Sequence, residues 1–448
     1  VDNTVNFKGT THENNFVGQA GADDVTFLIN TGSGVATVDA GNNTVTANAV
    51  TTGTLVVNAG NGNDTVSATA LTTGTIVAEL SDGNNDITLD GTFDSITATV
   101  ITGVGDDTVT IGDATVAGDT ITLNLGEGTN TLEISEDLTA GTWSITGLDT
   151  IAIGSSNAAA IMNSTELTGQ GYSITGDGTA TDRMSVQVDA AASVDFSSLI
   201  IDQTLTKGLA GLGITGSTGN DTIIGTDGSD SLASNGGTDT LTGGLRADTL
   251  TGGAGNDAFT FAEADSAGTN TDTITDFVAS GDNLAITIVA NSGTSTISAL
   301  DVGDATSNAN GLSLLSSKEG EFFFNTGTSQ FVMDLDGNGL IQASDLVVTM
   351  TGETGFAIAD LDTTITASTA NGTASFTTGA GDDTFNFSTS AASDVLIAAD
   401  TVAAGAGTDT INLALETNPY TTATWTNVSN IEKLVITDAT TLALGKIT

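Results

Sequence analysis

Residues 216–260 read GSTGNDTII GTDGSDSLA SNGGTDTLT GGLRADTLT GGAGNDAFT and align as five units of nine residues. Each unit begins with a loop-forming segment, has an Asp at its sixth position and a bulky apolar residue two positions later. The acidic column is Asp221, Asp230, Asp239, Asp248 and Asp257, and the apolar column is Ile223, Leu232, Leu241, Leu250 and Phe259. Consecutive units in one register identify a repeat architecture.

The nine-residue spacing gives each residue type a physical role. Glycine permits positive φ angles in a tight loop, which points its carbonyl oxygens and the Asp carboxylate at one spot. The apolar residue lies on a short strand that faces the interior. Two units complete one coil of a parallel β-roll, so we expect Asp221 to pair with Asp239, Asp230 with Asp248, and Asp239 with Asp257. Stacked carboxylates repel one another, and Ca²⁺, which prefers oxygen ligands, would join them into a ladder.

The units match the pattern G-G-x-G-x-D-x-U-x, and on this motif the chain resembles the RTX family of calcium-binding repeat proteins. The segment TDTITDFVASGDNLAI, which follows the units, is similar to the motif that closes many RTX arrays and caps the roll. The resemblance implies three further candidate ligands: Asp272, Asp276 and Asp282.

Two positions depart from the repeat pattern. Arg246 replaces a loop glycine of the fourth unit, and Ser234 and Asn235 replace the leading glycine pair of the third. We expect the Arg246 loop to lack its ion, with the guanidinium group in place of the cation.

Residues 334–345, DLDGNGLIQASD, fit the twelve-residue EF-hand loop except at the last position. The predicted ligands are Asp334, Asp336, Asn338, Leu340 through its carbonyl, Gln342 and Asp345. Because Asp is shorter than the bidentate Glu of an EF-hand, we expect a weaker calcium site. The entry flank resembles a strand, so we expect a calcium loop without a full helix–loop–helix pair.

A second, looser repeat of about 21–23 residues covers the first third of the chain. Its turn fragments are AGNNTV, AGNGNDTV, DGNNDI, GVGDDTV and GEGTNTL, from which we align the column Asn43, Asp64, Asp86, Asp107 and Asn130. Alternating apolar runs such as TLVVNA lie between the turns. Short strands and turns at this period are typical of a β-solenoid, in which each coil buries its apolar face on its neighbours.

The C-terminal part resumes this pattern with TGAGDDTFNF and AGAGTDTINLA. Single turns of this kind provide weaker metal candidates, namely Asp64, Asp107 and Asp383. Outside an array, such a turn is more often an Asx-type turn than a metal site.

These patterns predict an all-β fold: a parallel β-solenoid or β-helix with an embedded RTX calcium β-roll and an EF-hand-like calcium loop. The predicted segments are a solenoid over 1–155, a mixed β connection over 156–215, the β-roll with its capping motif over 216–286, a β segment with the EF-hand-like loop over 287–365, and a second solenoid over 366–448.

The composition restricts the partners. The chain has 55 acidic and 7 basic residues, with a formal net charge of −48, so it cannot provide the basic patches that nucleic acid requires. Since hydrophobic residues make up 38%, the acid is better explained by a folded protein that binds several Ca²⁺ ions than by disorder. There is no cysteine, and no apolar run approaches the roughly 18 residues of a membrane span.

Catalysis has little support in the sequence, and we predict a protein that is not an enzyme. His12 is the only histidine and lacks the second histidine of H-E-x-x-H, and no G-x-S-x-G elbow is present. Paired carboxylates leave a glycosidase open by residue type alone, but aromatic residues make up only 4% of the chain.

As a Thr-, Gly- and Asp-rich, cysteine-free chain, the protein resembles RTX-type bacterial surface-layer proteins. That resemblance implies type I secretion, an extracellular position on the cell surface, and calcium-driven folding and self-association into a lattice, with cell-surface polysaccharide as a possible anchor. Two alternatives share these motifs: an RTX adhesin or biofilm-matrix protein, and the calcium-folding module of a type I-secreted RTX enzyme.

Overall fold

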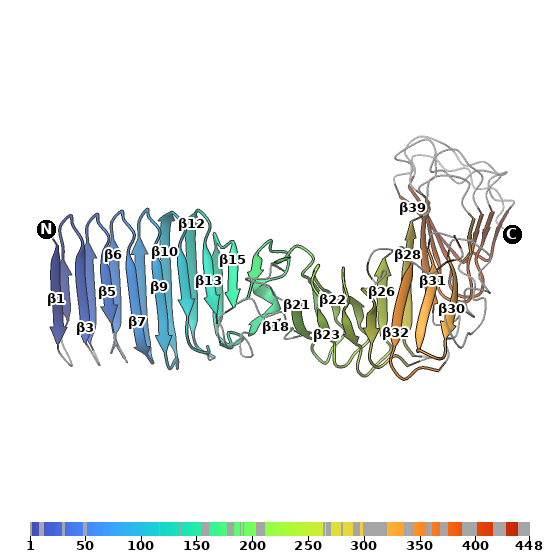
Figure 1. The fold of residues 1–448 in the computed structure, drawn as a ribbon, viewed down its shortest axis with the longest axis horizontal. Helices are drawn as coiled ribbons and strands as arrows, with labels where there is room; N and C mark the ends of the chain where they lie inside the picture. The colour runs from blue at the N-terminus through green and yellow to red at the C-terminus, as the bar shows by residue number, and fades with distance from the viewer. Residues whose placement is uncertain are drawn as a thin grey trace. The chain divides into compact units, whose positions relative to one another are not determined.

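The chain consists of β-strands stacked in parallel coils (Figure 1). The computed structural model describes residues 2–8, 13–28, 32–47, 52–153, 161–176, 183–202, 211–289, 296–298, 320–354, 356, 361–367, 375–387, 401–414 and 427–437, with short internal gaps. Two compact units are present: Val1–Asp189 with Val194–Thr215, and Ala190–Ser193 with Gly216–Thr448. The predicted all-β parallel solenoid is confirmed, whereas the five-segment division stays a prediction.

The first unit has two long parallel sheets whose strands alternate along the chain. The first sheet has the order β1 (Asn3–Lys8), β3 (Asp23–Leu28), β5 (Thr44–Ala47), β7 (Thr65–Leu71), β9 (Asp86–Gly91), β11 (Thr108–Ile111), β13 (Thr131–Ile134), β15 (Thr150–Ile153), β17 (Ser173–Thr175) and β20 (Ile200–Ile201). The second has the order β14 (Thr142–Thr146), β12 (Thr120–Glu127), β10 (Ile96–Val104), β8 (Gly74–Leu80), β6 (Thr54–Ala59), β4 (Ser33–Val38) and β2 (Asn14–Val17). Because consecutive strands fall in opposite sheets, each pair of strands forms one coil.

The remaining elements of the first unit are short. Strands β16 (Ile161–Asn163), β18 (Arg183–Gln187) and β21 (Gly211–Thr215) pair in parallel, and one 3-10 turn spans Ser164–Glu166. Strand β19 (Ser193–Asp195) has residues in both units.

The second unit continues the same architecture with shorter strands. One sheet contains β23 (Ser231–Ala233), β25 (Thr249–Thr251), β27 (Asp272–Ile274), β32 (Leu346–Met350), β31 (Gln330–Asp334) and β30 (Glu321–Asn325). The other contains β22 (Thr222–Ile224), β24 (Thr240–Thr242), β26 (Ala258–Ala262), β28 (Asn283–Val289), β33 (Leu361–Ala367), β35 (Thr384–Phe387), β37 (Thr410–Ala414) and β39 (Lys433–Thr437). A smaller sheet contains β29 (Thr296–Ser298), β34 (Ser375–Thr377), β36 (Thr401–Ala403) and β38 (Val428–Ser429). Among the described strands of this unit, only the pairs β30–β31 and β31–β32 are antiparallel.

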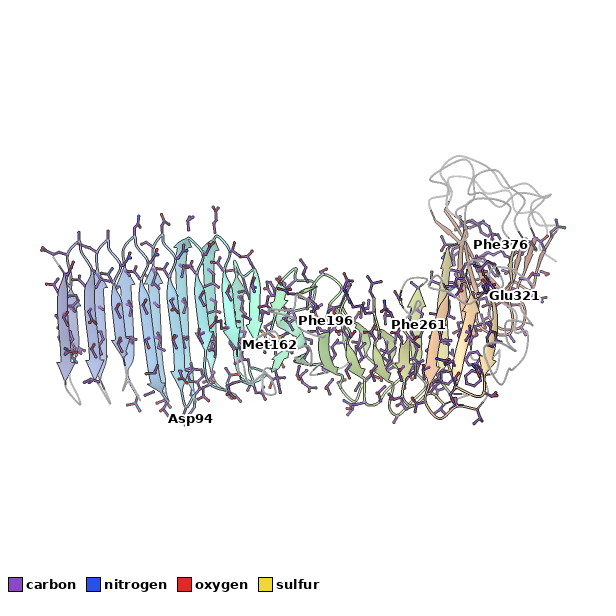
Figure 2. The ribbon with its side chains drawn as sticks, viewed as in Figure 1. Asp94, Met162, Phe196, Phe261, Glu321 and Phe376 are labelled. Carbon is purple, nitrogen blue, oxygen red and sulfur yellow. The ribbon has the colours of Figure 1, made fainter. Side chains whose placement is uncertain are left out.

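Strand alternation builds the core, because every second side chain of a strand points inward. In the first unit Val45, Val66 and Ile87 occupy the same register position on successive coils, and each is at most 1% exposed. In the second unit the apolar column of the repeats divides into two rows, Ile223–Leu241–Phe259 on one sheet and Leu232–Leu250 on the other. Figure 2 shows the side chains on the strands and labels Phe261, which lies on β26 and is 1% exposed.

Candidate metal centres

Two columns of Asp side chains follow the edges of the β-roll, and both are buried. In the first column Oδ1 of Asp239 accepts a hydrogen bond from the backbone N–H of Asp221 at 2.8 Å. Oδ1 of Asp257 accepts from the N–H of Asp239 at 2.9 Å, and Oδ1 of Asp282 from that of Asp257 at 2.9 Å. Each carboxylate therefore closes the turn of the coil that precedes it in the sequence.

The second column is built in the same way. Asp230 and Asp248 lie eighteen residues apart, and Asp272 of the capping motif follows them. The N–H of Asp230 donates to Oδ1 of Asp248 at 2.7 Å, and the N–H of Asp248 donates to Oδ1 of Asp272 at 2.7 Å. The structure thus brings together all three Asp pairs expected from the repeats. It also assigns two capping residues, Asp272 and Asp282, to different columns.

The columns contain buried carboxylate oxygens that the described part of the protein leaves without a hydrogen-bond partner. These atoms are Oδ2 of Asp239 and Oδ2 of Asp248, whose residues are 1% and 2% exposed. Burial raises the pKa of Asp248 to about 9, and the neighbouring carboxylates of Asp272 and Asp230 add to the rise although a backbone hydrogen bond opposes it. A buried anion of this kind requires a proton or a cation.

The loops around the columns have no room for a side chain at their glycines. A Cβ added at Gly243 would overlap Oδ2 of Asp248, and one at Gly225 would overlap the carbonyl oxygen of Gly243 one coil further on. Carbonyl and carboxylate oxygens therefore converge at the turns, which is the hard donor set that Ca²⁺ prefers. The residues present fit calcium, although no group of three or more His, Cys, Asp or Glu that could hold a metal is found within the described ranges.

Asp276 has a different role from the other two residues of the capping motif. Its Oδ1 accepts from the N–H of Gly252 at 3.0 Å and its Oδ2 from the N–H of Gly253 at 2.7 Å. Both oxygens thus bind backbone donors of the last repeat loop. This geometry makes Asp276 a cap for that loop, outside the two columns.

The two departures from the repeat pattern are accommodated by backbone conformation. Arg246 and Asn235 take positive φ angles of 75° and 73°, as the glycines they replace would. Asn235 Nδ2 donates to the carbonyl oxygen of Gly216, and Ser234 Oγ to that of Gly252, both at 2.7 Å. The Arg246 side chain is exposed, whereas the carboxylates of Asp230 and Asp248 are buried. The structure therefore does not place the guanidinium where a cation would lie.

The EF-hand-like loop joins two antiparallel strands. Strand β31 ends at Asp334 and β32 begins at Leu346, and the pairing of Met333 with Leu346 places Asp334 beside Asp345 at the mouth of the loop. These two residues are 1% and 0% exposed, and Oδ1 of Asp345 accepts from the N–H of Leu335 at 3.1 Å. Strands flank this loop on both sides.

The other predicted ligands of the loop are less fully placed. Oδ1 of Asn338 accepts from the N–H of Leu340 at 2.7 Å, within an Asx-type turn, and the Leu340 side chain is exposed. Asp336 and Gln342 lie outside the described residues. Ligation by this loop stays a prediction.

A similar column is present in the first unit, with one correction to its predicted members. The N–H of Asp64 donates to Oδ1 of Asn85 at 3.1 Å, and the N–H of Asn85 to Oδ1 of Asp107 at 2.8 Å. Asn85 therefore occupies the buried position that we assigned to Asp86, which is exposed and opens strand β9. The column residue always precedes an inward apolar residue by two, and for Ile87 that residue is Asn85.

The C-terminal turns of the second unit form a third carboxylate column. The N–H of Asp383 donates to Oδ1 of Asp409 at 2.9 Å, and the N–H of Asp409 to Oε2 of Glu432 at 2.9 Å. Burial raises the pKa of Asp383 to about 6. Sequence reasoning missed Asp409 and Glu432, although both precede an inward or strand apolar residue by two positions, Ile411 and Leu434.

Comparison with known protein families finds two matches. The family described as Peptidase M10 serralysin C terminal matches residues 212–363, about a third of the chain and all of the nonapeptide array. The family described as RTX calcium-binding nonapeptide repeat (4 copies) matches residues 397–414, which include Asp409. This chain contains RTX calcium-binding repeats. A search of the curated proteins finds no match.

The matches determine the cofactor of this RTX protein and its broad class. RTX nonapeptide repeats bind calcium, so Ca²⁺ is the cofactor. RTX repeat proteins of the serralysin type are secreted by type I secretion, which places this protein among the secreted proteins. The matched segments are a C-terminal, non-catalytic serralysin domain and an RTX repeat, and no catalytic protease domain is matched. Among the described residues, no helix is long and apolar enough to span a membrane.

Proposed function

We propose that this RTX protein is a structural component of an extracellular bacterial surface layer, folded and assembled by Ca²⁺ and held at the cell by surface polysaccharide. The observation that carries the proposal is the unpartnered Oδ2 of Asp239 and of Asp248, buried in stacked columns. Because metal binding supplies the charge that these columns need, its free energy becomes folding free energy. A net charge of −48 also keeps copies apart until divalent cations neutralise it.

The repetitive architecture of the chain supports a structural role. Apart from the antiparallel strands β30–β32, the described sheets of both units are parallel, and the solenoid strands β35, β37 and β39 follow the segment that matches the serralysin C terminal. A repetitive fold of this kind presents long regular surfaces, which suit repeated contacts between copies.

One observation favours a second candidate. The match of residues 212–363 to the serralysin C terminal fits equally well the calcium-folding module of a type I-secreted enzyme. An RTX adhesin or biofilm-matrix protein would share the calcium columns but not an ordered lattice.

Assembly distinguishes these candidates. The purified calcium-free chain would be titrated with CaCl₂ and followed by far-ultraviolet circular dichroism, light scattering and negative-stain electron microscopy. We expect β-structure and ordered two-dimensional sheets to form together and to disappear on addition of EGTA. A chain that folds with calcium but stays monomeric would instead identify the folding module, and irregular aggregates would identify an adhesin or matrix protein.

A further inference from the structure

The buried column of the first unit alternates amide and carboxyl side chains. Along successive coils its members are Asn3, Asp23, Asn43, Asp64, Asn85, Asp107, Asn130 and Asp149, of which the six from Asp23 to Asn130 are buried. Each member accepts a hydrogen bond from the backbone N–H of the preceding one, as in the second unit. No two carboxylates are therefore neighbours in this column, whereas they are neighbours throughout the columns of the β-roll.

The amide nitrogens of this column lie within a set of oxygen atoms. Nδ2 of Asn43 donates to the carbonyl oxygens of Asp39 and Gly41 at 3.0 and 2.9 Å, and to Oδ1 of Asp64 in the next coil at 2.8 Å. Two loop carbonyls and a carboxylate thus surround one NH₂ group, whose hydrogens carry partial positive charge. These are the donor types that bind calcium in an RTX turn.

The same arrangement recurs two coils later. Nδ2 of Asn85 donates to the carbonyl oxygens of Ser81 and Gly83 at 3.2 and 2.9 Å, and to Oδ1 of Asp107 at 2.9 Å. In the β-roll an Asp stands at every corresponding position, so those columns contain no side-chain amide.

The wider spacing of the carboxylates also lowers the electrostatic cost of burying them in the first unit. Oδ2 of Asp23, Asp64 and Asp107 is buried without a hydrogen-bond partner in the described part of the protein. Neighbouring strands of a sheet lie about 4.8 Å apart, so the carboxylates of the first unit, two coils apart, are separated by about 9.6 Å. The carboxylates of the β-roll, one coil apart, are separated by about 4.8 Å. Coulomb repulsion falls at least by half over that change in distance.

We propose that the first unit folds without calcium, because the side-chain amides of Asn43 and Asn85 take the place that calcium takes in the second unit. Calcium dependence is then confined to Gly216–Thr448 and its associated segment, and Asp64 and Asp107 are not metal ligands. The inference shares with the proposed function only the calcium columns of the second unit, and it does not depend on lattice formation.

Hydrogen exchange of the full chain, read peptide by peptide with mass spectrometry in calcium and in EGTA, tests this inference. We expect peptides within 23–153 to keep their protection in EGTA within about tenfold, a change of ~1.4 kcal/mol in opening free energy, while peptides within 216–289 lose at least a hundredfold. A loss in the first unit as large as that in the second would overturn the inference. Protection of both units in EGTA would instead contradict the proposed calcium-driven folding and the assignment of calcium dependence to the second unit, and would overturn the comparison between amide and cation.

A pair of variants tests the role of the amide itself. Asn85→Asp places three carboxylates on consecutive coils, whereas Asn84→Asp makes the same charge change at an exposed neighbour whose Oδ1 accepts from the N–H of Asp106. In EGTA we expect N85D to lower the protection of the first unit at least tenfold relative to N84D. Equal protection of the two variants would show that the amide does not replace a cation.

Discussion

The two units of this protein use different side chains to accept the backbone N–H groups of neighbouring coils. In both, a buried side-chain oxygen accepts from the N–H of the previous coil, at 2.8 Å for Asn43 to Asp64 and for Asp221 to Asp239. In the first unit every second acceptor is an amide, which also donates to its neighbours. In the second unit the acceptors are carboxylates, which need a proton or a cation. We therefore expect one architecture to fold without ions in the first unit and to depend on them in the second.

Core substitutions should give the largest effects and should separate the units. Phe259 and Leu132 are each 0% exposed, in the second and first unit respectively. Phe259→Ala should cost about 3–5 kcal/mol and Leu132→Ala about 2–5 kcal/mol, from lost burial and the cavity left behind. Because folding of the second unit is coupled to calcium, F259A should also raise the calcium concentration at which that unit becomes protected from hydrogen exchange. If the effect of L132A on the first unit changed with calcium, the comparison would be wrong.

A matched pair of Asp→Asn changes should have an effect on stability that depends on calcium in the second unit but not in the first. Asp239→Asn removes one carboxylate from an all-acid column and should raise the calcium midpoint about tenfold, the ~1.4 kcal/mol of one charge-assisted contact. Without calcium the same change removes like-charge repulsion and should stabilise the second unit. Asp64→Asn places an amide between the amides of Asn43 and Asn85, so its effect on the first unit should be the same with and without calcium. Urea unfolding at several calcium concentrations measures both variants.

The prediction of the columns from the sequence succeeded where the period was strict. The nine-residue units fix the pairing of Asp221, Asp239 and Asp257, because one residue type recurs at one position. It failed for Asn85, because DGNND offers two adjacent turn formers and the longer coils vary in length. The spacing of two residues to the next inward apolar residue, here Ile87, would have resolved that choice.

The alternation of amide and acid side chains could not be predicted from the sequence, for a different reason. Asn and Asp are both favoured in turns, so exchange between them at Asn43 and Asp64 resembles neutral variation. Only the coil-to-coil hydrogen bonds show that these residues are direct neighbours. The strands around the EF-hand-like loop were predicted on the entry side from apolar residues, while its ligand set depends on side-chain positions that a pattern does not give.

The pH dependence of the calcium-free protein should differ between the units. Burial raises the pKa of Asp248 from 3.8 to about 9, so the folded second unit binds more protons than the unfolded chain between those values. Its free energy of unfolding without calcium should therefore fall as pH rises from about 4 to about 9. Burial also raises the pKa of Asp64, but hydrogen bonds from Asn43 oppose the rise, so the first unit should respond less.

Urea unfolding in EGTA from pH 4.5 to pH 9, with hydrogen exchange to separate the units, measures this difference. Saturating calcium should reverse the trend in the second unit, because the ion competes with protons for the same oxygens. A second unit whose calcium-free stability rose over this range would contradict the assignment of uncompensated buried carboxylates.

The smallest effect is expected at the irregular repeat loop. Arg246 is exposed with a φ of 75°, a conformation that costs a non-glycine residue roughly 1–2 kcal/mol. Arg246→Gly should therefore stabilise the second unit by about 1 kcal/mol without changing the number of bound ions. Calorimetric calcium titration provides the count, and one additional ion in R246G would show that the guanidinium had occupied a metal position.

The direction of the buried hydrogen bonds gives the stack a polarity. At Asp221, Asp239 and Asp257 the donor N–H belongs to one coil and the acceptor carboxylate to the coil that follows it in sequence. Every coil is thus finished by its C-terminal neighbour, and the capping residue Asp282 is the terminal acceptor of its column. Loss of the last coil leaves a buried N–H donor without its acceptor, while loss of the first leaves a buried carboxylate oxygen without its donor. A truncated stack therefore exposes unpaired N–H donors at its C-terminal end and unpaired carboxylate acceptors at its N-terminal end.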